Sequence, residues 1–193
     1  MKSAIEKKVR ESHDVSSRFF TENASELEAC ARAAAKRFAE GGRLYVMGNG
    51  GSACDAAHVA VEFLHPIVEK RRPLPAMALS TDFATLTAIG NDDDFARVFE
   101  RTLQVAATLA DLVLGISTSG ASANVLRALG WAREKGLLAI GFAGRDGGRM
   151  PSVCDHAFVV RSWSTHRVQE THTMLLHLFW DLVHVALGED DVL

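Results

Sequence analysis

The spacing of apolar and polar positions divides the chain into a helical first part and an alternating remainder. Over residues 1–40, apolar side chains recur at helical spacing between charges, which predicts a helical arm made of two helices. Gly41 and Gly42 end this arm. Short apolar runs then alternate with segments of helical period, and a last long helix is expected over 165–187. The runs are RLYVM (43–47), PAMALS (75–80), DLVLGIS (111–117), LLAIGF (137–142) and HAFVV (156–160).

These runs are apolar at nearly every position, which is typical of parallel strands covered by helices on both faces. Repetition of strand, helix and strand therefore predicts a doubly wound α/β fold with a five-stranded parallel sheet flanked by helices. No linker, internal repeat or charge block interrupts the 193 residues. We expect a single domain over 1–193, with 1–40 as the helical arm and 41–193 as the α/β core.

Two loops that directly follow predicted strands indicate a phosphate site, because ligands of open parallel sheets bind beyond the carboxyl ends of the strands. The glycines of GNGGS (48–52) let the backbone approach a ligand closely. The second loop, STSGAS (117–122), places four hydroxyls around the start of a helix expected over 124–135. Unpaired N–H groups and the positive dipole end of that helix suit a phosphate dianion. The alternative is that Ser122 only caps the helix and the other hydroxyls are solvated.

Several classes of function are disfavoured by the sequence. Neither loop fits GxxxxGK[ST] or GxGxxG, which argues against nucleoside triphosphates and dinucleotides. A net charge of -3 provides no basic field for nucleic acid. No apolar run approaches the roughly 20 residues of a membrane helix, and MKSAIEKKVRES is charged where a signal peptide is apolar, so we expect a cytoplasmic protein. Cys30, Cys54 and Cys154 form no CxxC pair and are expected to be structural thiols.

Four longer segments together resemble the SIS (sugar isomerase) family, and within it the phosphoheptose isomerases. They are GNGGSACDAAH (48–58), LSTDFATLTAIGND (79–92), GISTSGASANV (115–125) and RVQETHTMLLH (167–177). The resemblance covers nearly the whole chain and implies an SIS-type fold and a homotetramer with active sites at subunit interfaces. It also implies isomerisation of sedoheptulose 7-phosphate to D-glycero-D-manno-heptose 7-phosphate, for the biosynthesis of activated heptose.

The resemblance further implies roles for individual residues. Glu62 and His177 correspond to the acid and base of the family. Some members bind zinc, and one ion per subunit would here be held by His58, Glu62, Gln169 and His177. The implied substrate-binding residues are Asn49, Gly50, Gly51, Ser52, Asn91, Asp92, Ser117, Thr118, Ser119, Ser122 and Gln169.

The spacing of these residues is compatible with the chemistry. His58 and Glu62 are four apart on one predicted helix and therefore share a face, and Gln169 and His177, eight apart, share a face of another. Aldose–ketose isomerisation passes through an enediol and needs a base at one carbon and a proton donor near the next. Glu62 would take the proton from carbon 1, and His177 would serve the carbonyl side. The histidines expected to be structural or exposed are His65, His156, His166, His172 and His184.

One position departs from the family pattern. A basic residue commonly follows the catalytic glutamate by one helical turn, whereas this chain has Pro66, which should also end the helix. Arg71 and Arg72 are the candidates to reach the same space. This departure leaves open an enzyme acting on another sugar phosphate. A non-catalytic SIS regulator that binds a replication initiator is a second alternative, against which the presence of Glu62 and His177 favours an enzyme.

Overall fold

The computed structural model describes residues 1–67 and 71–191. Its centre is a parallel five-stranded sheet with the strand order β2-β1-β3-β4-β5. The strands are β1 (Leu44–Gly48), β2 (Ala76–Ala78), β3 (Leu112–Ser117), β4 (Leu138–Gly144) and β5 (His156–Val160). The predicted five-stranded parallel sheet is thus confirmed, with each predicted strand present.

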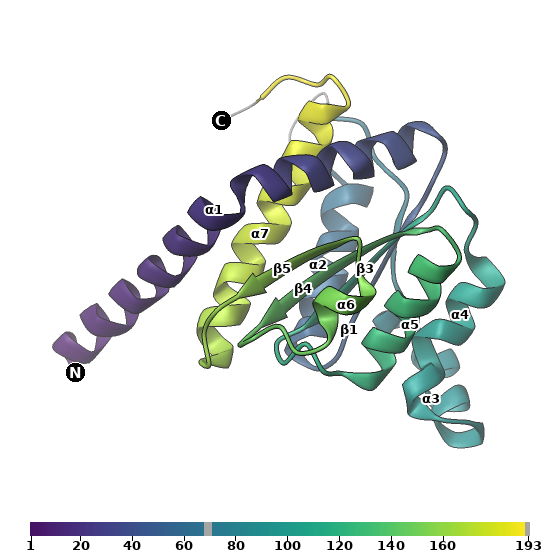
Figure 1. The fold of residues 1–193 in the computed structure, drawn as a ribbon, viewed down its shortest axis with the longest axis horizontal. Coiled ribbons are helices and arrows are strands. Elements are labelled where there is room, and N and C mark those ends of the chain that lie inside the picture. The colour runs from purple at the N-terminus through teal and green to yellow at the C-terminus, as the bar shows by residue number, and fades with distance from the viewer. Residues whose placement is uncertain (68–70, 192–193) are drawn as a thin grey trace.

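Helices cover both faces of this sheet (Figure 1). The helices are α1 (Lys2–Ala39), α2 (Gly51–Leu64), α3 (Phe83–Asp92), α4 (Val98–Ala106), α5 (Ala123–Glu134), α6 (Met150–Val153) and α7 (Thr165–Ala186), with short 3₁₀ helices η1 (Leu79–Thr81) and η2 (Phe95–Arg97). Side chains of α1, α2 and α7 pack with Leu114 and Ile140 in one core. Side chains of α4, α5 and α6 pack with Tyr45 and Val113 in the other. Alternate residues of β1 and β3 enter opposite cores, as expected for a doubly wound sheet.

The helical arm differs from the prediction, because α1 is one continuous helix rather than two. No glycine or proline lies between Lys2 and Ala39, so nothing in the backbone chemistry breaks the helix. α1 packs along α7 from about Lys8 onward, since Arg167 donates to the Lys8 carbonyl and the Ser12 hydroxyl donates to Glu170. Its N-terminal end projects beyond the body of the molecule (Figure 1). Among the described residues, no helix combines the length and the apolar character that a bilayer crossing requires.

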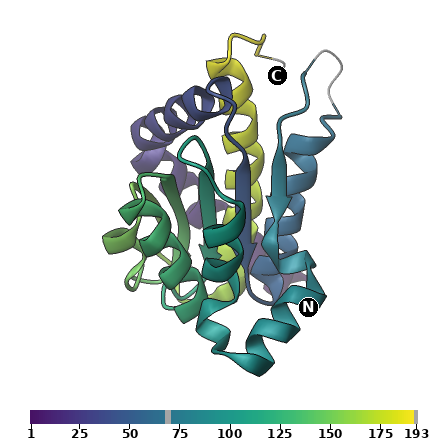
Figure 2. The same cartoon turned by 90° about the vertical axis from the view of Figure 1, so that its right-hand side faces the viewer.

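The order of the strands brings the two predicted ligand loops together. β1 and β3 are neighbours, and Gly48 at the end of β1 is in register with Ile116 near the end of β3. α2 and α7 lie side by side on the same face of the sheet (Figure 2). The loops after β1 and β3 and the facing sides of α2 and α7 therefore meet at one edge of the sheet.

Candidate functional site

The turn after β3 holds a cluster of hydroxyls. Ser117 Oγ lies 2.9 Å from Ser122 Oγ and 3.4 Å from Ser119 Oγ. Ser122 occupies the N-cap position of α5, yet its side chain makes no capping hydrogen bond. Its hydroxyl instead faces Ser117, which is buried. Ser122 therefore does not cap α5 with its side chain, and Thr118 is half-buried in the same turn.

Backbone packing holds this turn in shape. Gly120 has a φ of 61°, a conformation that glycine adopts without strain. A side chain at Gly120 would collide with the backbone of Gly147, which belongs to the loop after β4. The N–H of Arg149 also donates to the Gly120 carbonyl at 2.9 Å. The loop after β4 is thus a brace for the hydroxyl turn.

The glycine loop after β1 is anchored on both sides. Ser80, just after β2, accepts from the Gly48 N–H at 3.2 Å and donates to the Gly48 carbonyl at 2.8 Å. Asn49 and Asn124 form a reciprocal pair of amide hydrogen bonds, each 2.9 Å long. Ser52 is buried in the first turn of α2. Ser80 and Asn124 were not predicted from the sequence, where the only signal was their place directly after a strand or at the start of a helix.

Gln169 reaches this loop from α7. A Cβ added at Gly51 would fall far inside van der Waals contact of the Gln169 side-chain nitrogen, so the amide lies directly over the glycine backbone. Gly50, which precedes α2, has a φ of 56°. Two glycines therefore serve different purposes here: Gly50 permits the turn and Gly51 leaves room for Gln169.

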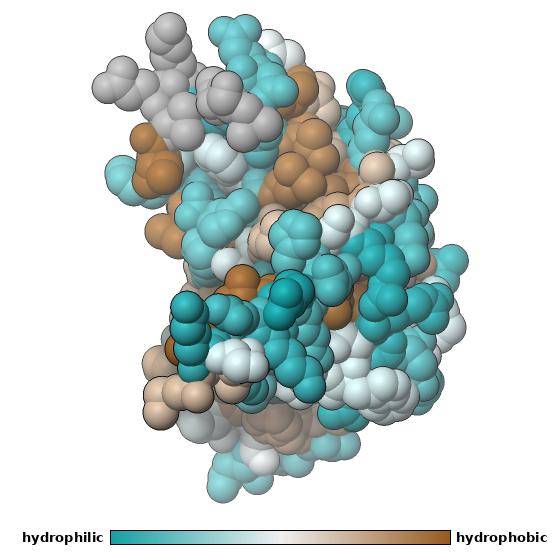
Figure 3. All heavy atoms as spheres, turned by 90° about the vertical axis from the view of Figure 1, so that its left-hand side faces the viewer, coloured by the Kyte–Doolittle hydropathy of each residue, from teal (hydrophilic) through white to brown (hydrophobic). Residues whose placement is uncertain are grey.

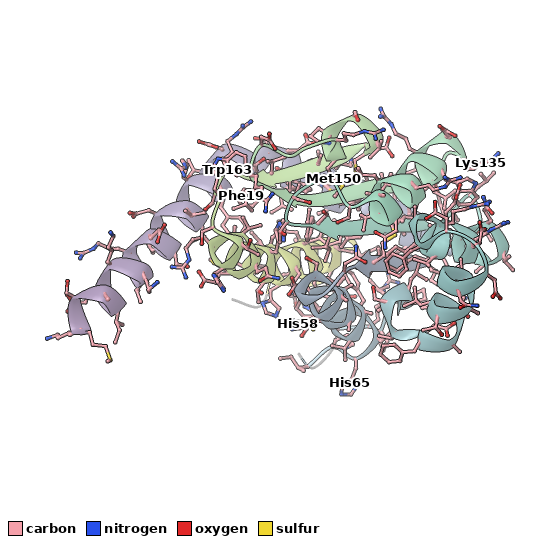
Figure 4. The ribbon with its side chains drawn as sticks, turned by 90° about the horizontal axis from the view of Figure 1, so that it is seen from below. Phe19, His58, His65, Lys135, Met150 and Trp163 are labelled. Carbon is pink, nitrogen blue, oxygen red and sulfur yellow. The ribbon has the colours of Figure 1, made fainter. Side chains whose placement is uncertain are left out.

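His58, Glu62 and His177 form a compact group between α2 and α7. His58 Nε2 lies 3.2 Å from Glu62 Oε1 and 3.2 Å from His177 Nε2, and His177 Nε2 lies 4.0 Å from Glu62 Oε1. Figure 4 shows His58 on α2 close to α7, whereas His65 lies at the end of α2 and points away. The fold thus brings together three predicted residues from two helices, although His58 and His177 are 119 positions apart in the sequence.

This group is suited to a metal ion. Tetrahedral zinc with bonds of about 2.0–2.1 Å needs ligand atoms about 3.3 Å from one another. Two of the three separations already match that edge length, and all three ligand atoms lie within 4.8 Å of one another. Imidazole nitrogens and a carboxylate oxygen are also ligand types that zinc prefers.

Asp55 is a further acidic residue near this group. It lies on α2 one turn before His58, is partly buried, and its Oδ2 has no hydrogen-bond partner among the described residues. Burial raises its pKa, and the nearby His58 acts in the opposite direction. The sequence contained this residue within GNGGSACDAAH, but nothing in its spacing distinguished it.

Asn91 and Asp92 lie elsewhere. They end α3, are exposed, and Asn91 Nδ2 donates to Asp92 Oδ1 at 2.7 Å. α3 packs on η2 and α4, and Asp92 borders a cavity of about 550 Å³ between α3 and α4. Within one described chain, the structure therefore does not join these two predicted substrate contacts to the group at His58.

Around Pro66, the question is whether Arg71 or Arg72 takes the place of the missing basic residue. α2 ends at Leu64, as the proline predicts. Arg71 is buried, pairs with the Asp181 carboxylate and lies over the Trp180 ring at 4.7 Å. Arg72 Nε lies 3.6 Å from Glu189. Both arginines therefore face the C-terminal end of α7, and the buried Arg71 is held there by Asp181.

Three of the other histidines make contacts within the scaffold. His172 is fully buried, and its Nε2 donates to the Ala143 carbonyl at 3.1 Å. His156 pairs with Glu26 of α1, and His184 pairs with Glu189. His65 and His166 are exposed. The three cysteines are free, with Cys30 and Cys154 buried and Cys54 exposed.

Comparisons with known proteins identify the family of this chain. A family model described as the SIS domain matches residues 9–144. A phosphoheptose isomerase of Solidesulfovibrio magneticus is 48% identical over 181 residues, covering 94% of this chain and 88% of that protein. A phosphoheptose isomerase of Aquifex aeolicus is 40% identical over 189 residues, covering 98% of this chain and 99% of that protein. The structure of phosphoheptose isomerase GmhA from Neisseria gonorrhoeae superposes with a TM-score of 0.87 at 33% identity, covering 94% of this chain and 97% of that one. This chain therefore belongs to the SIS-domain family, among the phosphoheptose isomerases.

Proposed function

We propose that this protein is an aldose–ketose isomerase that converts sedoheptulose 7-phosphate to D-glycero-D-manno-heptose 7-phosphate for activated-heptose biosynthesis. The observation that carries this proposal is the group of His58, Glu62 and His177 at the same sheet edge as the hydroxyl turn. A purely regulatory SIS protein has no chemical need for that group. A cytoplasmic location remains a prediction from the sequence.

The phosphate end of the sugar is assigned to the turn after β3. Hydroxyls of Ser117, Ser119 and Ser122 converge there at the start of α5, where the helix dipole favours an anion. The chain of the sugar then runs past Asn49 and Gln169 toward α2 and α7. This orientation places the reacting carbons away from the phosphate.

Glu62 and His177 carry the proton transfers in this proposal. Glu62 Oε1 faces both histidines, so Oε2 is the oxygen available to take a proton from carbon 1 of the ketose. The electrons of that C–H bond form the double bond of the enediol while His177 protonates the carbonyl oxygen. Glu62 then returns its proton to carbon 2, and the hydroxyl of carbon 1 gives its proton back to His177. No atom is gained or lost, as an isomerisation requires.

We assign the metal site to His58, Glu62 and His177, with Gln169 as the proposed fourth ligand. A zinc ion held there would polarise the carbonyl of the substrate as a Lewis acid. The ligand atoms of the histidines and the carboxylate have the separations described above, whereas Gln169 lies against Gly51. Gln169 would therefore connect the metal group to the glycine loop.

We further propose a homotetramer, and the observation that supports it is exposed apolar surface. α3 has no buried residue, and Phe83 at its start is 75% exposed. A groove of about 490 Å³ between α1 and α7 is lined mainly by apolar side chains, including Phe20 and Leu182. Figure 3 shows apolar side chains gathered at the surface on the side from which α1 projects. Contacts through α3 would bring Asn91 and Asp92 to the site of a neighbouring subunit.

A second candidate is an isomerase of a different sugar phosphate. The observation that favours it is Pro66, together with the engagement of Arg71 and Arg72 at the end of α7. Without a basic side chain one turn after Glu62, a different sugar length or stereochemistry could be accepted. Relative kcat/KM values for sedoheptulose 7-phosphate and shorter ketose phosphates distinguish the two candidates.

The test of the main proposal is isomerase activity of the purified protein toward sedoheptulose 7-phosphate. We expect aldose formation by the wild type and a loss of at least about 100-fold in Glu62→Gln and His177→Ala, because a positioned acid or base contributes about 10²–10⁴-fold. An inactive wild type contradicts the function. Full activity in both variants contradicts the assignment of the residues.

A further inference from the structure

The amide pair of Asn49 and Asn124 joins the two loops of the site. Asn49 directly follows β1, and Asn124 is the second residue of α5, so the pair spans 75 positions of sequence. Asn49 Nδ2 donates to Asn124 Oδ1, and Asn124 Nδ2 donates to Asn49 Oδ1, both at 2.9 Å. Asn49 is exposed toward the site, whereas Asn124 is only 3% exposed.

The orientation of the buried member is fixed by the backbone. The N–H of Val125 donates to Asn124 Oδ1 at 2.9 Å, which identifies that atom as the carbonyl oxygen of the amide. The nitrogen of Asn124 must then face Asn49. Because an amide can pair reciprocally in only one sense, Asn49 must present its oxygen to that nitrogen.

This arrangement leaves a defined set of groups for a ligand. The pair uses one of the two N–H bonds of Asn49 and one lone pair of its oxygen. One N–H donor and one acceptor site remain, in an orientation that the Val125 backbone sets through Asn124. Without Asn124, the Asn49 amide could turn over and exchange its donor for its acceptor.

We propose that Asn124 is a positioning residue that locks the Asn49 amide for recognition of the phosphorylated sugar. Asn124 is buried behind Asn49 and acts through it. This inference rests on the proposed function, because it takes Asn49 as a contact of the sugar. It adds a requirement for asparagine at position 124, because its side chain must accept from Val125 and also donate to Asn49.

The test is a double-mutant cycle of Asn49→Ala and Asn124→Ala, in which the dissociation constant of sedoheptulose 7-phosphate is measured for each variant. Binding is measured by calorimetry in a Glu62→Gln background, so that turnover does not contribute heat. We expect Asn124→Ala to raise the dissociation constant about tenfold, because the Asn49 side chain must then be ordered by the ligand. Asn49→Ala should raise it at least as much, and the double variant should equal Asn49→Ala alone.

The outcomes separate this inference from the proposed function. Effects of Asn49→Ala and Asn124→Ala that multiply would show that Asn124 acts on something other than Asn49, and would overturn the inference. Absence of binding without either substitution would overturn it as well. If the protein binds the sugar with the expected coupling but its wild type forms no aldose, the proposed isomerase activity is contradicted. The positioning of Asn49 by Asn124 is then still supported.

Two further measurements guard against a general loss of structure. Ser16→Ala removes the polar group of another buried side chain, on α1, and should leave the dissociation constant unchanged. If Asn124→Ala does not fold, solvent exchange of the Asn49 side-chain amide protons in the unmodified protein decides. One slowly exchanging Nδ2 proton supports the lock, and two protons exchanging at the rate of a free amide overturn it.

Discussion

Gly51 shows how one residue position limits the site. Its backbone lies beneath the Gln169 amide, and any side chain at this position would occupy the space of that amide. Its φ is not positive, so the backbone would accept alanine. The need for glycine is therefore one of space above the loop.

Gly51→Ala should displace Gln169 and lower kcat/KM at least about tenfold, since small misplacements in an active site cost up to about 100-fold. The matched control is Gly130→Ala on α5, where an added Cβ meets only ordinary contact with Val153. Gly130→Ala should keep the wild-type kinetics and stabilise the helix by about 0.5–1 kcal/mol. Wild-type kinetics in Gly51→Ala would show that Gln169 is not needed where the structure places it.

At this scale the sequence predicted the residues that follow strands but not their supports. The loops that contain Asn49 and Ser117 were predicted because ligands bind beyond the carboxyl ends of parallel strands, whereas the role of Asn49 as a sugar contact came from the family resemblance. Ser80 and Asn124 hold those loops through contacts between chain segments. These contacts depend on β2 and β3 both lying beside β1, an order that apolar patterning does not provide.

Among the elements, α7 shows where local patterning is sufficient. The predicted segment 165–187 matches α7 to within one residue. The predicted strand 75–80 was too long, because Leu79–Thr81 turns into a 3₁₀ helix. The hydroxyl of Thr81 donates to the Ala78 carbonyl at 2.8 Å, a local side-chain bond that competes with strand pairing.

α7 also carries a pH-dependent contribution to stability. Burial of His172 lowers its pKa to about 4 in the folded protein, against about 6.5 when unfolded. Between these values the unfolded chain binds a proton that the folded chain does not, so the free energy of unfolding falls as the pH falls from 6.5 to 4. The expected loss from this group between pH 7 and pH 5 is about 2 kcal/mol.

His172→Gln tests this contribution, because glutamine can still donate to the Ala143 carbonyl and does not titrate. Urea unfolding at pH 7 and pH 5 should show a smaller loss of stability in the variant than in the wild type. The other histidines remain in both proteins and their contributions cancel. Identical pH dependence in the two proteins would mean that His172 is not the group responsible.

At the scale of the whole molecule, two separate elements expose apolar side chains: α3 and the arm α1. α1 is one continuous helix of 38 residues where two helices were predicted, and it exposes Ile5 and Val9 to solvent. Patterning of a single chain cannot distinguish an apolar face that packs internally from one that meets another subunit. This is why the sequence predicted the fold closely, whereas the tetramer rested on the family resemblance.

Native mass spectrometry tests the assembly and the metal together. We expect four subunits carrying four zinc ions, and release of zinc together with activity on chelation. Replacing Phe83 by aspartate should shift the mass to smaller species, because it charges the apolar start of α3. A monomer with full activity would contradict the shared active site, and an active tetramer without metal would remove zinc from the proposal.

The central claim is that Glu62 moves a proton between carbons 1 and 2 of sedoheptulose 7-phosphate. Its most direct test is NMR of the reaction in deuterium oxide, with wild type and Glu62→Gln compared at equal concentration. We predict that the wild type forms the aldose, with deuterium at carbon 2 in the fraction of turnovers in which the proton on Glu62 exchanges with solvent before it is returned. Glu62→Gln should form the aldose at least about 100-fold more slowly. Aldose formed by Glu62→Gln at the wild-type rate, or no aldose from the wild type, would contradict the account.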